Sequence, residues 1–375
     1  MTDRRSFGIH TDVNGMDLGL LKQSALVKVL FEKSEAAIVR GWKDIAHPYA
    51  YWLARTNIDQ DNAQPLGELQ QRYKAAATID AARAVGVWYA EWIASWALPA
   101  GLDYFFWESG PNEEDDMSAK APAYCEAFTR RCLELGLKPA AGMYSFGKPG
   151  VMKYNGYDGW LPWQPLFRLI ERANTGRIPP IAGFAYHEYA LKGDMVGSID
   201  HAIERYLLSH YQGPVFISEF GYADGVKPSS TETVLEQMKT MNARYGADDR
   251  VCGTALYDIR RNGGVFDWSY MYRDLERALI EQNLPILPIR NFAGGIVEVP
   301  PTPEPEPLPE PTEFYNVIVA SQYGCNMRAG ATMDSDLRGY AAQGSKFRAQ
   351  RQAQNSYIYL PDLGVFIYEP NTRAA

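Results

Sequence analysis

The stretch PVFISEFGY at residues 214–222 carries a short apolar run that ends in an acidic residue, Glu219. An apolar run of this length after Gly and Pro predicts a buried strand. The stretch FFWESGPNE at 105–113 has the same form and ends in Glu113. Apolar strands that alternate with helices indicate a parallel sheet covered on both faces, and barrel enzymes keep their catalytic groups at the carboxyl ends of such strands. Glu113 and Glu219 are therefore the candidate catalytic pair.

The pattern around these two stretches predicts a (β/α)8 TIM barrel, because eight strands in about 290 residues fit that fold. We expect strands at 6–10, 26–31, 36–42, 102–107, 140–146, 181–189, 215–220 and 253–258. Helical patterns fall at 66–96, 121–137, 165–173, 199–210, 231–245 and 272–282. Residues 26–31 could instead extend a helix. A doubly wound open sheet is the alternative fold, but no Gly-rich phosphate loop accompanies it.

A proline-rich segment separates the barrel from a tail. Residues 299–313 hold seven prolines interleaved with glutamates, a composition that favours an extended spacer over a packed core. We therefore expect a catalytic barrel at 1–295, a linker at 296–312 and a second domain at 313–375. Short alternating segments in this last part, separated by turn residues, predict a small all-β unit.

Composition narrows the partners. The formal net charge is -8 and no basic stripe is present, which argues against nucleic acid. No run is long enough to span a membrane, and the polar N-terminus has no signal-peptide core, so localisation stays open. No Cys/His spacing suggests a metal site, and we expect no cofactor.

Cys125 and Cys132 are about 10 Å apart on a predicted helix, too far for a disulfide. Oligomeric state does not follow from the sequence.

The tail resembles the bacterial SH3-like domain. The likeness rests on Cys325-Asn326-Met327-Arg328-Ala329-Gly330-Ala331, which looks like the family's Asn-x-Arg-x-Gly signature, and on the closing run GVFI at 364–367. That family commonly binds cell-wall or other extracellular polymers, so the resemblance implies a polymer-binding role here.

The barrel half resembles the clan A glycoside hydrolases. Asn112-Glu113 looks like that clan's Asn-Glu motif at the end of strand four, and Glu219 looks like its glutamate on strand seven. His187 and Tyr189 resemble its His-x-Tyr pair on strand six. By this resemblance Glu113 is the acid/base and Glu219 the nucleophile, while Asn112 holds the sugar 2-hydroxyl and Tyr189 contacts the nucleophile. Retaining chemistry would place the two carboxyl groups roughly 5 Å apart.

Other candidates depart from the clan's pattern. The clan's arginine sits on strand two, whereas Arg40 falls on our third strand; it could supply a cation that lowers the pKa of Glu219. Tyr257 would have to replace the clan's strand-eight Trp. Trp160 and Trp163, in a loop after strand five, could be sugar-stacking platforms. An unusual loop, 108–111, lies between Trp107 and Asn112 and leaves Glu108 and Glu114 open as alternatives to Glu113.

Each of these residues has an ordinary structural explanation as well. A single glutamate at a strand end is more often a hydrogen-bond acceptor, and an isolated histidine or arginine is more often part of the core or of a salt bridge. The combination favours a retaining glycoside hydrolase that cleaves a β-linked polysaccharide, directed to its substrate by the tail. Two alternatives remain: a cell-wall lytic enzyme that acts on peptidoglycan, and a non-catalytic glycan-binding protein on a barrel scaffold.

Overall fold

The computed structural model describes most of the barrel and parts of the tail. The described residues are 4–13, 16–56, 58, 67–112, 114, 116, 118–142, 151–152, 157–158, 160–190, 207, 210–222, 230–257, 272–287, 314–320, 325–328, 337–341, 343–351, 357–360, 365–368 and 372–374. The chain divides into two compact units, Met1–Gly295 and Ile296–Ala375. The predicted linker, 296–312, lies outside the described residues.

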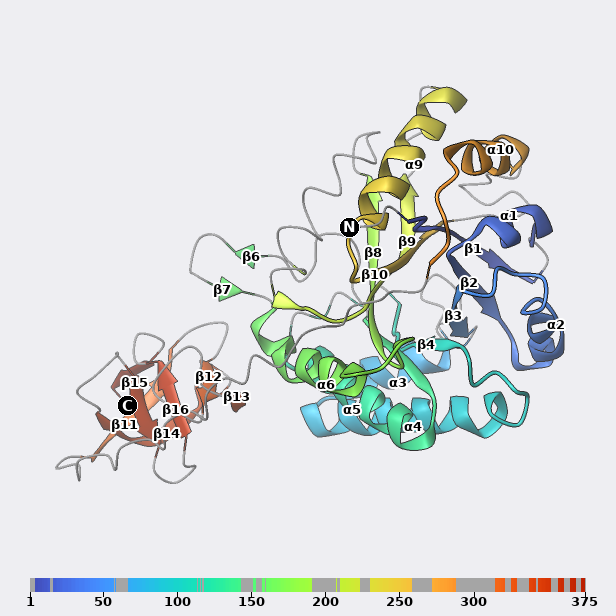
Figure 1. The fold of residues 1–375 in the computed structure, drawn as a ribbon. Coiled ribbons are helices and arrows are strands. Elements are labelled where there is room, and N and C mark those ends of the chain that lie inside the picture. Colours follow the sequence, from blue (N-terminus) through green and yellow to red (C-terminus); the bar gives the residue numbers. More distant parts are fainter. Residues whose placement is uncertain are drawn as a thin grey trace. The chain divides into compact units, whose positions relative to one another are not determined.

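The first unit contains a closed barrel of eight parallel strands (Figure 1). The order around the barrel is β1-β10-β9-β8-β5-β4-β3-β2, and each neighbouring pair is parallel. The strands are β1 (Phe7–Asp12), β2 (Leu26–Phe31), β3 (Tyr51–Thr56), β4 (Phe106–Glu108), β5 (Lys138–Ala141), β8 (Gly183–Ala190), β9 (Val215–Tyr222) and β10 (Val251–Leu256). This order confirms the predicted eight-stranded parallel barrel. All carboxyl ends of the strands therefore lie at one end of the barrel.

Helices are described between most successive strands, and α10 follows the last strand of the barrel. They are α1 (Leu18–Gln23), α2 (Ala36–Gly41), α3 (Glu68–Ala75), α4 (Ile79–Ala97), α5 (Lys120–Leu135), α6 (Gln164–Asn174), α9 (Thr231–Gly246) and α10 (Tyr272–Gln282). Their ends follow local sequence signals: the Thr78 side chain accepts from the backbone N–H of Ala81 at the start of α4, and α5 stops at Gly136 in the left-handed region (φ 82°). Short 3-10 turns, Lys33–Glu35 and Leu161–Trp163, and a small hairpin, β6 (Val151–Met152) with β7 (Tyr157–Asp158), complete the described part.

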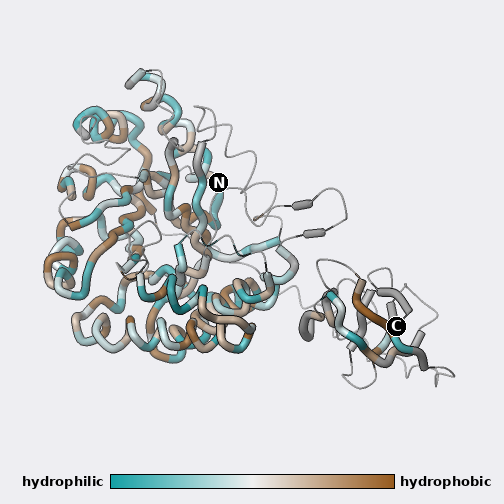
Figure 2. The backbone as a smooth tube through the Cα atoms, turned by 180° about the vertical axis from the view of Figure 1, so that it is seen from behind, coloured by the Kyte–Doolittle hydropathy of each residue, from teal (hydrophilic) through white to brown (hydrophobic). Residues whose placement is uncertain are grey.

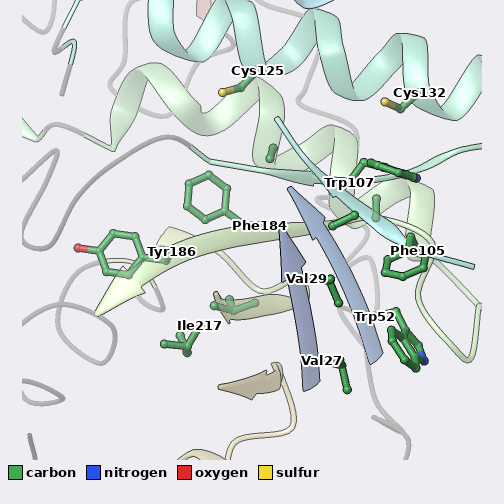
Figure 3. Close-up of a cluster of buried hydrophobic side chains, with 14 of the residues drawn as sticks. Val27, Val29, Trp52, Phe105, Trp107, Cys125, Cys132, Phe184, Tyr186 and Ile217 are labelled. Carbon is green, nitrogen blue, oxygen red and sulfur yellow. The ribbon is translucent and has the colours of Figure 1, made fainter. Parts of the chain in front are cut away.

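Two hydrophobic layers hold this unit together. The larger layer lies between the strands and the helices; Figure 3 shows part of it, with Trp107 of β4 and Phe184 of β8 among its side chains. The helices alternate apolar and polar residues along their turns, as amphipathic helices on a core do (Figure 2). A smaller cluster fills the inside of the barrel: Leu26, Tyr51, Leu53, Phe106, Ala140, Ala185, Phe216, Cys252 and Ala255. Strand alternation separates the layers, since Val27 faces the outer cluster and Leu26 the inner one.

The prediction that residues 36–42 form the third strand is wrong. These residues are helical as α2, and the third strand is β3, Tyr51–Thr56. Only Ala36 and Val39 of α2 are buried, a spacing of three that suits a helix face. The segment just before α2 is a capping box, in which the Glu32 side chain and the Glu35 side chain each accept from the other's backbone N–H.

Two other helical predictions need comment. The sequence pattern predicts one helix over 66–96, whereas the chain forms α3 and α4 with a break at 76–78. The helix predicted at 199–210 falls almost entirely outside the described residues. Cys125 and Cys132 are both on α5 (Figure 3) and both are free, as their spacing predicts.

The described residues of the second unit form one seven-stranded sheet of order β13-β12-β16-β15-β14-β11-β17, with antiparallel neighbours. The strands are β11 (Phe314–Val319), β12 (Cys325–Arg328), β13 (Leu337–Ala341), β14 (Lys346–Arg351), β15 (Tyr357–Leu360), β16 (Val365–Tyr368) and β17 (Thr372–Ala374). The unit has a small core of its own around Val317, Val319, Ala349 and Leu360. Across the described parts of both units, no helix is both long enough and apolar enough to cross a membrane.

Candidate functional site

A layer of polar side chains lies beyond the inner hydrophobic cluster, toward the carboxyl ends of the strands. Four of its members follow an inner-cluster residue by two positions on the strand: Lys28 follows Leu26, Arg55 follows Leu53, Glu108 follows Phe106 and His187 follows Ala185. All members are buried despite being ionisable, and they come from six different strands. They are His10 (β1), Lys28 (β2), Arg55 (β3), Glu108 (β4), His187 (β8) and Glu219 (β9). We call this set the polar layer.

A bulge in β9 brings Glu219 into this layer. Tyr186 of β8 pairs with Ile217, but the next residue, His187, pairs with Glu219, so β9 carries one extra residue. The pairing with β10 shows the same shift. Without the extra residue, strict alternation would turn Ser218 inward and Glu219 outward, because a shift of one residue exchanges the two faces of a strand. The bulge therefore directs the carboxylate to the inside of the barrel.

Four basic side chains surround one oxygen of Glu219. Their distances to Oε1 are 2.8 Å from Lys28 Nζ, 3.4 Å from Arg55 Nη1, 3.5 Å from His187 Nε2 and 3.8 Å from His10 Nδ1. Burial by itself would raise the pKa of the Glu219 carboxyl, but the charges of His187, Lys28, His10 and Arg55 hold that pKa well below its usual range. Glu219 is therefore a buried, ionised carboxylate, which is the state that a nucleophile or a stabiliser of positive charge requires.

Lys28 also connects Glu219 to a second carboxylate. Its Nζ lies 3.0 Å from Oε2 of Glu108, and the Lys28 side chain has no exposed surface. Glu108 ends β4 and is itself buried. One ammonium group thus lies between carboxylates that come from strands β4 and β9. Such an arrangement fixes the position of all three side chains, because each charge would be costly to bury without its partner.

The structure places some predicted site residues in or beside the polar layer. His187 is in it, and Tyr257, directly after β10, packs its ring against His10 with centroids 5.0 Å apart. Asn112 is half-buried, and its carbonyl oxygen accepts from Gln70 Nε2 at 2.9 Å. Tyr189 pairs with Gly221 in the sheet, but its side chain lies outside the described residues, as does the whole of Glu113.

Arg40 is not near Glu219, contrary to prediction. It is exposed on α2, and its Nη1 donates to the carbonyl oxygen of Ala100 at 3.3 Å. Helices α2 and α4 each lead back to the amino end of the next strand, and Arg40 and Ala100 lie at the far ends of these helices. Arg40 therefore lies toward the amino-terminal end of the barrel, opposite the polar layer. The prediction that Arg40 lies in the site was wrong because it depended on a third strand at 36–42, and these residues are helical. Lys28 and Arg55 occupy the place that was predicted for it.

Trp160 and Trp163 are core residues in this structure and not open platforms. Each has only 1% of its surface exposed. Trp160 packs against Phe167 and Tyr186, and Trp163 meets Phe184 edge to face with ring centroids 5.6 Å apart. A sugar can stack only on an accessible ring face, so neither tryptophan is available for it as placed.

Comparisons with known proteins find similar solved structures but no family to which the chain can be assigned. No family model matches the chain, and no curated protein matches it. Among solved structures, the chain is similar to XacCel5A at 11% identity, with a TM-score of 0.47 over 74% of this chain and 99% of that one. A GH128 endo-β-1,3-glucanase from Pseudomonas viridiflava is 17% identical, with a TM-score of 0.41 over 75% and 98%.

A third similar structure is a GH5-4 broad-specificity endoglucanase from Clostridium acetobutylicum, at 10% identity and a TM-score of 0.38 over 74% of this chain and 97% of that one. These neighbours are glycoside hydrolases, and XacCel5A has also been solved with cellopentaose. At these TM-scores the likeness supports no further step. The fold assignment rests on the strand order itself.

Sequence reasoning missed His10, Lys28 and Arg55 as members of the site. A signal for Lys28 was present: the run LVKVLF at 26–31 is apolar on both strand faces except for one lysine. Burying a charge inside such a strand destabilises the fold unless a partner of opposite charge lies beside it. The described residues contain no group of three His, Cys, Asp or Glu side chains arranged to hold a metal ion.

Proposed function

We propose that this chain is a retaining glycoside hydrolase that cleaves a β-linked polysaccharide, with Glu219 as the nucleophile and Glu113 as the acid/base. The observation that carries the proposal is the state of Glu219. It is a buried carboxylate at the carboxyl end of a barrel strand, surrounded by four basic groups that keep it ionised. A nucleophile in this chemistry must be ionised before the sugar arrives.

The partners of Glu108 and Glu114 support Glu113 as the acid. Glu108 lies 3.0 Å from Lys28 Nζ, which also lies 2.8 Å from Glu219, so the Glu108 carboxyl group is already held by the lysine that contacts the proposed nucleophile. The acid must instead deliver a proton to the leaving oxygen. Glu114 is paired with Lys74 at 3.3 Å, away from the polar layer. We therefore assign Glu108 to holding Lys28 in place, and Glu113 keeps the acid role.

His187, Tyr257 and Asn112 would contact the sugar. His187 and Tyr257 lie at the polar layer, where the substrate's reacting carbon must approach Glu219. Asn112 precedes the proposed acid, a position from which its amide could reach the sugar 2-hydroxyl. Tyr189 belongs to the same proposal on the strength of its place on β8.

The test is a hydrolysis screen over plant, fungal and bacterial wall polysaccharides, followed by variants on whichever substrate is cleaved. Glu219→Gln should lose at least about 10⁴-fold in kcat, the scale seen when a member of a catalytic unit is removed. NMR of the first product should show the β-anomer, because double displacement retains configuration. A 2-fluoro-glycoside inactivator should label Glu219 and no other residue by mass spectrometry. An α-anomeric product would rule out retention, and full activity in Glu219→Gln would rule out the nucleophile.

We further propose that residues 313–375 form an SH3-like domain that binds the polymer. This second unit has a core of its own, and its β12 strand carries the Asn326–Arg328 part of the signature. A chain ending at residue 312 should keep its turnover of soluble fragments and lose activity on insoluble material. If the substrate proves to be peptidoglycan, the cell-wall lytic alternative replaces the plant or fungal one. Binding without any turnover across the screen would favour the glycan-binding alternative.

A further inference from the structure

Helix α3 is an addition to the basic strand-helix repeat. It lies between β3 and the long helix α4, which by itself already leads to β4. Leu69, Gln70 and Tyr73 are its buried residues. Leu69 and Tyr73 join the large core, but Gln70 is a polar side chain with no exposed surface at all. A buried amide on a short added helix calls for an explanation.

Gln70 holds one particular peptide group. Its Nε2 donates to the carbonyl oxygen of Asn112 at 2.9 Å. That carbonyl belongs to the peptide bond that joins Asn112 to Glu113, so the hydrogen bond restrains the planar peptide group directly before the proposed acid. The other end of the amide, Oε1, has no hydrogen-bond partner among the described residues. The contact with the loop is therefore what Gln70 supplies.

Further contacts bind α3 to the residues after Glu113. Tyr73 donates its hydroxyl to Oδ2 of Asp116 at 2.8 Å. Lys74 lies 3.3 Å from Glu114, and Lys120 at the start of α5 reaches back to the carbonyl oxygen of Ala76. The loop between β4 and α5 is thus tied to α3 both immediately before and immediately after the proposed acid.

These ties are mostly polar. An open cavity of about 470 Å³ lies at the junction, lined by Tyr73, Lys74, Glu114, Asp116 and Lys120. Because water reaches this space, the exposed Lys74–Glu114 pair contributes little. The Gln70 side chain has no exposed surface, so solvent weakens its part-buried hydrogen bond to Asn112 less than the Lys74–Glu114 pair.

We propose that Gln70 is a positioning residue, which acts through the Asn112–Glu113 peptide to aim the acid/base carboxyl at the leaving group. This inference rests on the proposed function. It predicts that loss of the Gln70 amide impairs protonation of the leaving group, while substrate binding and the attack by Glu219 persist.

The variant is Gln70→Met, which keeps an unbranched chain of similar size and removes the donor. The free energy of unfolding should change little. The substitution removes one hydrogen bond, but it also removes the buried Oε1 atom of Gln70, which has no hydrogen-bond partner among the described residues. Gln71→Met is the matched control: the same substitution on the same helix, at an exposed position. Hydrogen exchange of peptides covering 110–117 should be about 5-fold faster in Gln70→Met than in wild type or in the control, the scale of one hydrogen bond. Unchanged exchange would overturn the inference whatever the enzyme's activity.

The kinetic arm uses two aryl glycosides of the cleaved sugar, one with a poor leaving group and one with a dinitrophenyl leaving group that needs no proton. For Gln70→Met we expect kcat/KM to fall about 10- to 100-fold on the first and less than about 2-fold on the second. Equal losses on both would overturn a positioning role for Gln70. Glu113→Gln separates the proposed role of Glu113 from that of Gln70. If this variant shows no selective loss on the poor leaving group, Glu113 is not the acid. The hydrogen-exchange result still reports whether Gln70 holds the loop.

Discussion

Lys28 Nζ lies 2.8 Å from Oε1 of Glu219, and neither side chain has more than 3% of its surface exposed. The same nitrogen lies 3.0 Å from Glu108. Lys28 therefore links the carboxylates of Glu108 and Glu219, which come from strands β4 and β9. The electrostatic state of the candidate nucleophile depends on a residue almost two hundred positions away in sequence.

Replacing Lys28 tests this dependence. In Lys28→Met the pKa of Glu219 should rise, because one of the charges that lower it is gone. Since the nucleophile must be ionised, activity is lost as pH falls through that pKa, so the acid limb of the kcat/KM profile should move to higher pH. The free energy of unfolding should fall by about 3–5 kcal/mol, as when one partner of a buried pair is removed.

Two controls accompany this variant. Lys28→Arg keeps the charge and should leave the acid limb closer to its original place. Lys22→Met removes an exposed lysine of α1 and should alter neither the profile nor the stability. An acid limb that stays in place in Lys28→Met would show that Lys28 does not tune Glu219.

A pair of arginine variants tests the corrected position of the second cation. Arg55 Nη1 lies 3.4 Å from Glu219, whereas Arg40 is exposed at the far end of the barrel. Arg55→Met should therefore lower kcat/KM by about 10-fold or more, because the nucleophile loses a nearby positive charge whose interaction with it contributes about 1–3 kcal/mol. Arg40→Met should change kcat/KM less than about 2-fold and the free energy of unfolding by no more than about 0.5 kcal/mol. Equal effects of the two substitutions would contradict this placement.

The barrel was readable from the sequence because its strands are short apolar runs between helical patterns. β2, β8, β9 and β10 are close to where the pattern put them. The third strand was missed because residues 36–42 contain Ile and Val, which favour strands, while YWLART ends in two polar residues. The arginine in that stretch is buried only because the barrel closes around it, a tertiary effect that no local pattern encodes.

The candidate site was only partly readable for a similar reason. Glu219 and His187 lie on strands whose apolar flanks marked them, so their place could be predicted. The bulge that turns Glu219 inward depends on the pairing of β9 with both neighbours, and this register is not visible in one strand alone. Trp160 and Trp163 have the sequence setting of loop residues, but packing against β8 buries them.

The two tryptophans give a third prediction. Trp160→Ala should lower the free energy of unfolding by about 3–5 kcal/mol, the usual cost of deleting a buried aromatic side chain. Trp160→Phe, which keeps a ring in the same layer, should cost less and leave KM unchanged, because the ring contacts protein and not sugar. Chemical denaturation and KM on the cleaved polysaccharide are the two measurements. A raised KM in Trp160→Phe at unchanged stability would restore Trp160 as a sugar platform.

Glu188 gives the last prediction. It alternates with His187 on β8 and so faces away from the polar layer, with 1% of its surface exposed. Neither carboxyl oxygen has a hydrogen-bond partner among the described residues, and burial raises the pKa of this carboxyl well above its usual range. The unfolded chain gives up the proton near the ordinary glutamate pKa of 4.5, whereas the folded chain keeps it.

Between those two pKa values the folded state binds more protons, so the contribution of Glu188 to stability falls as pH rises. Glu188→Gln cannot ionise and has nearly the same shape. Its gain in the free energy of unfolding over wild type should be near zero at about pH 4 and reach about 1–3 kcal/mol at about pH 7. Urea denaturation at the two pH values measures this difference directly. A gain that is the same at both would mean that Glu188 ionises in the folded protein much as it does in the unfolded chain.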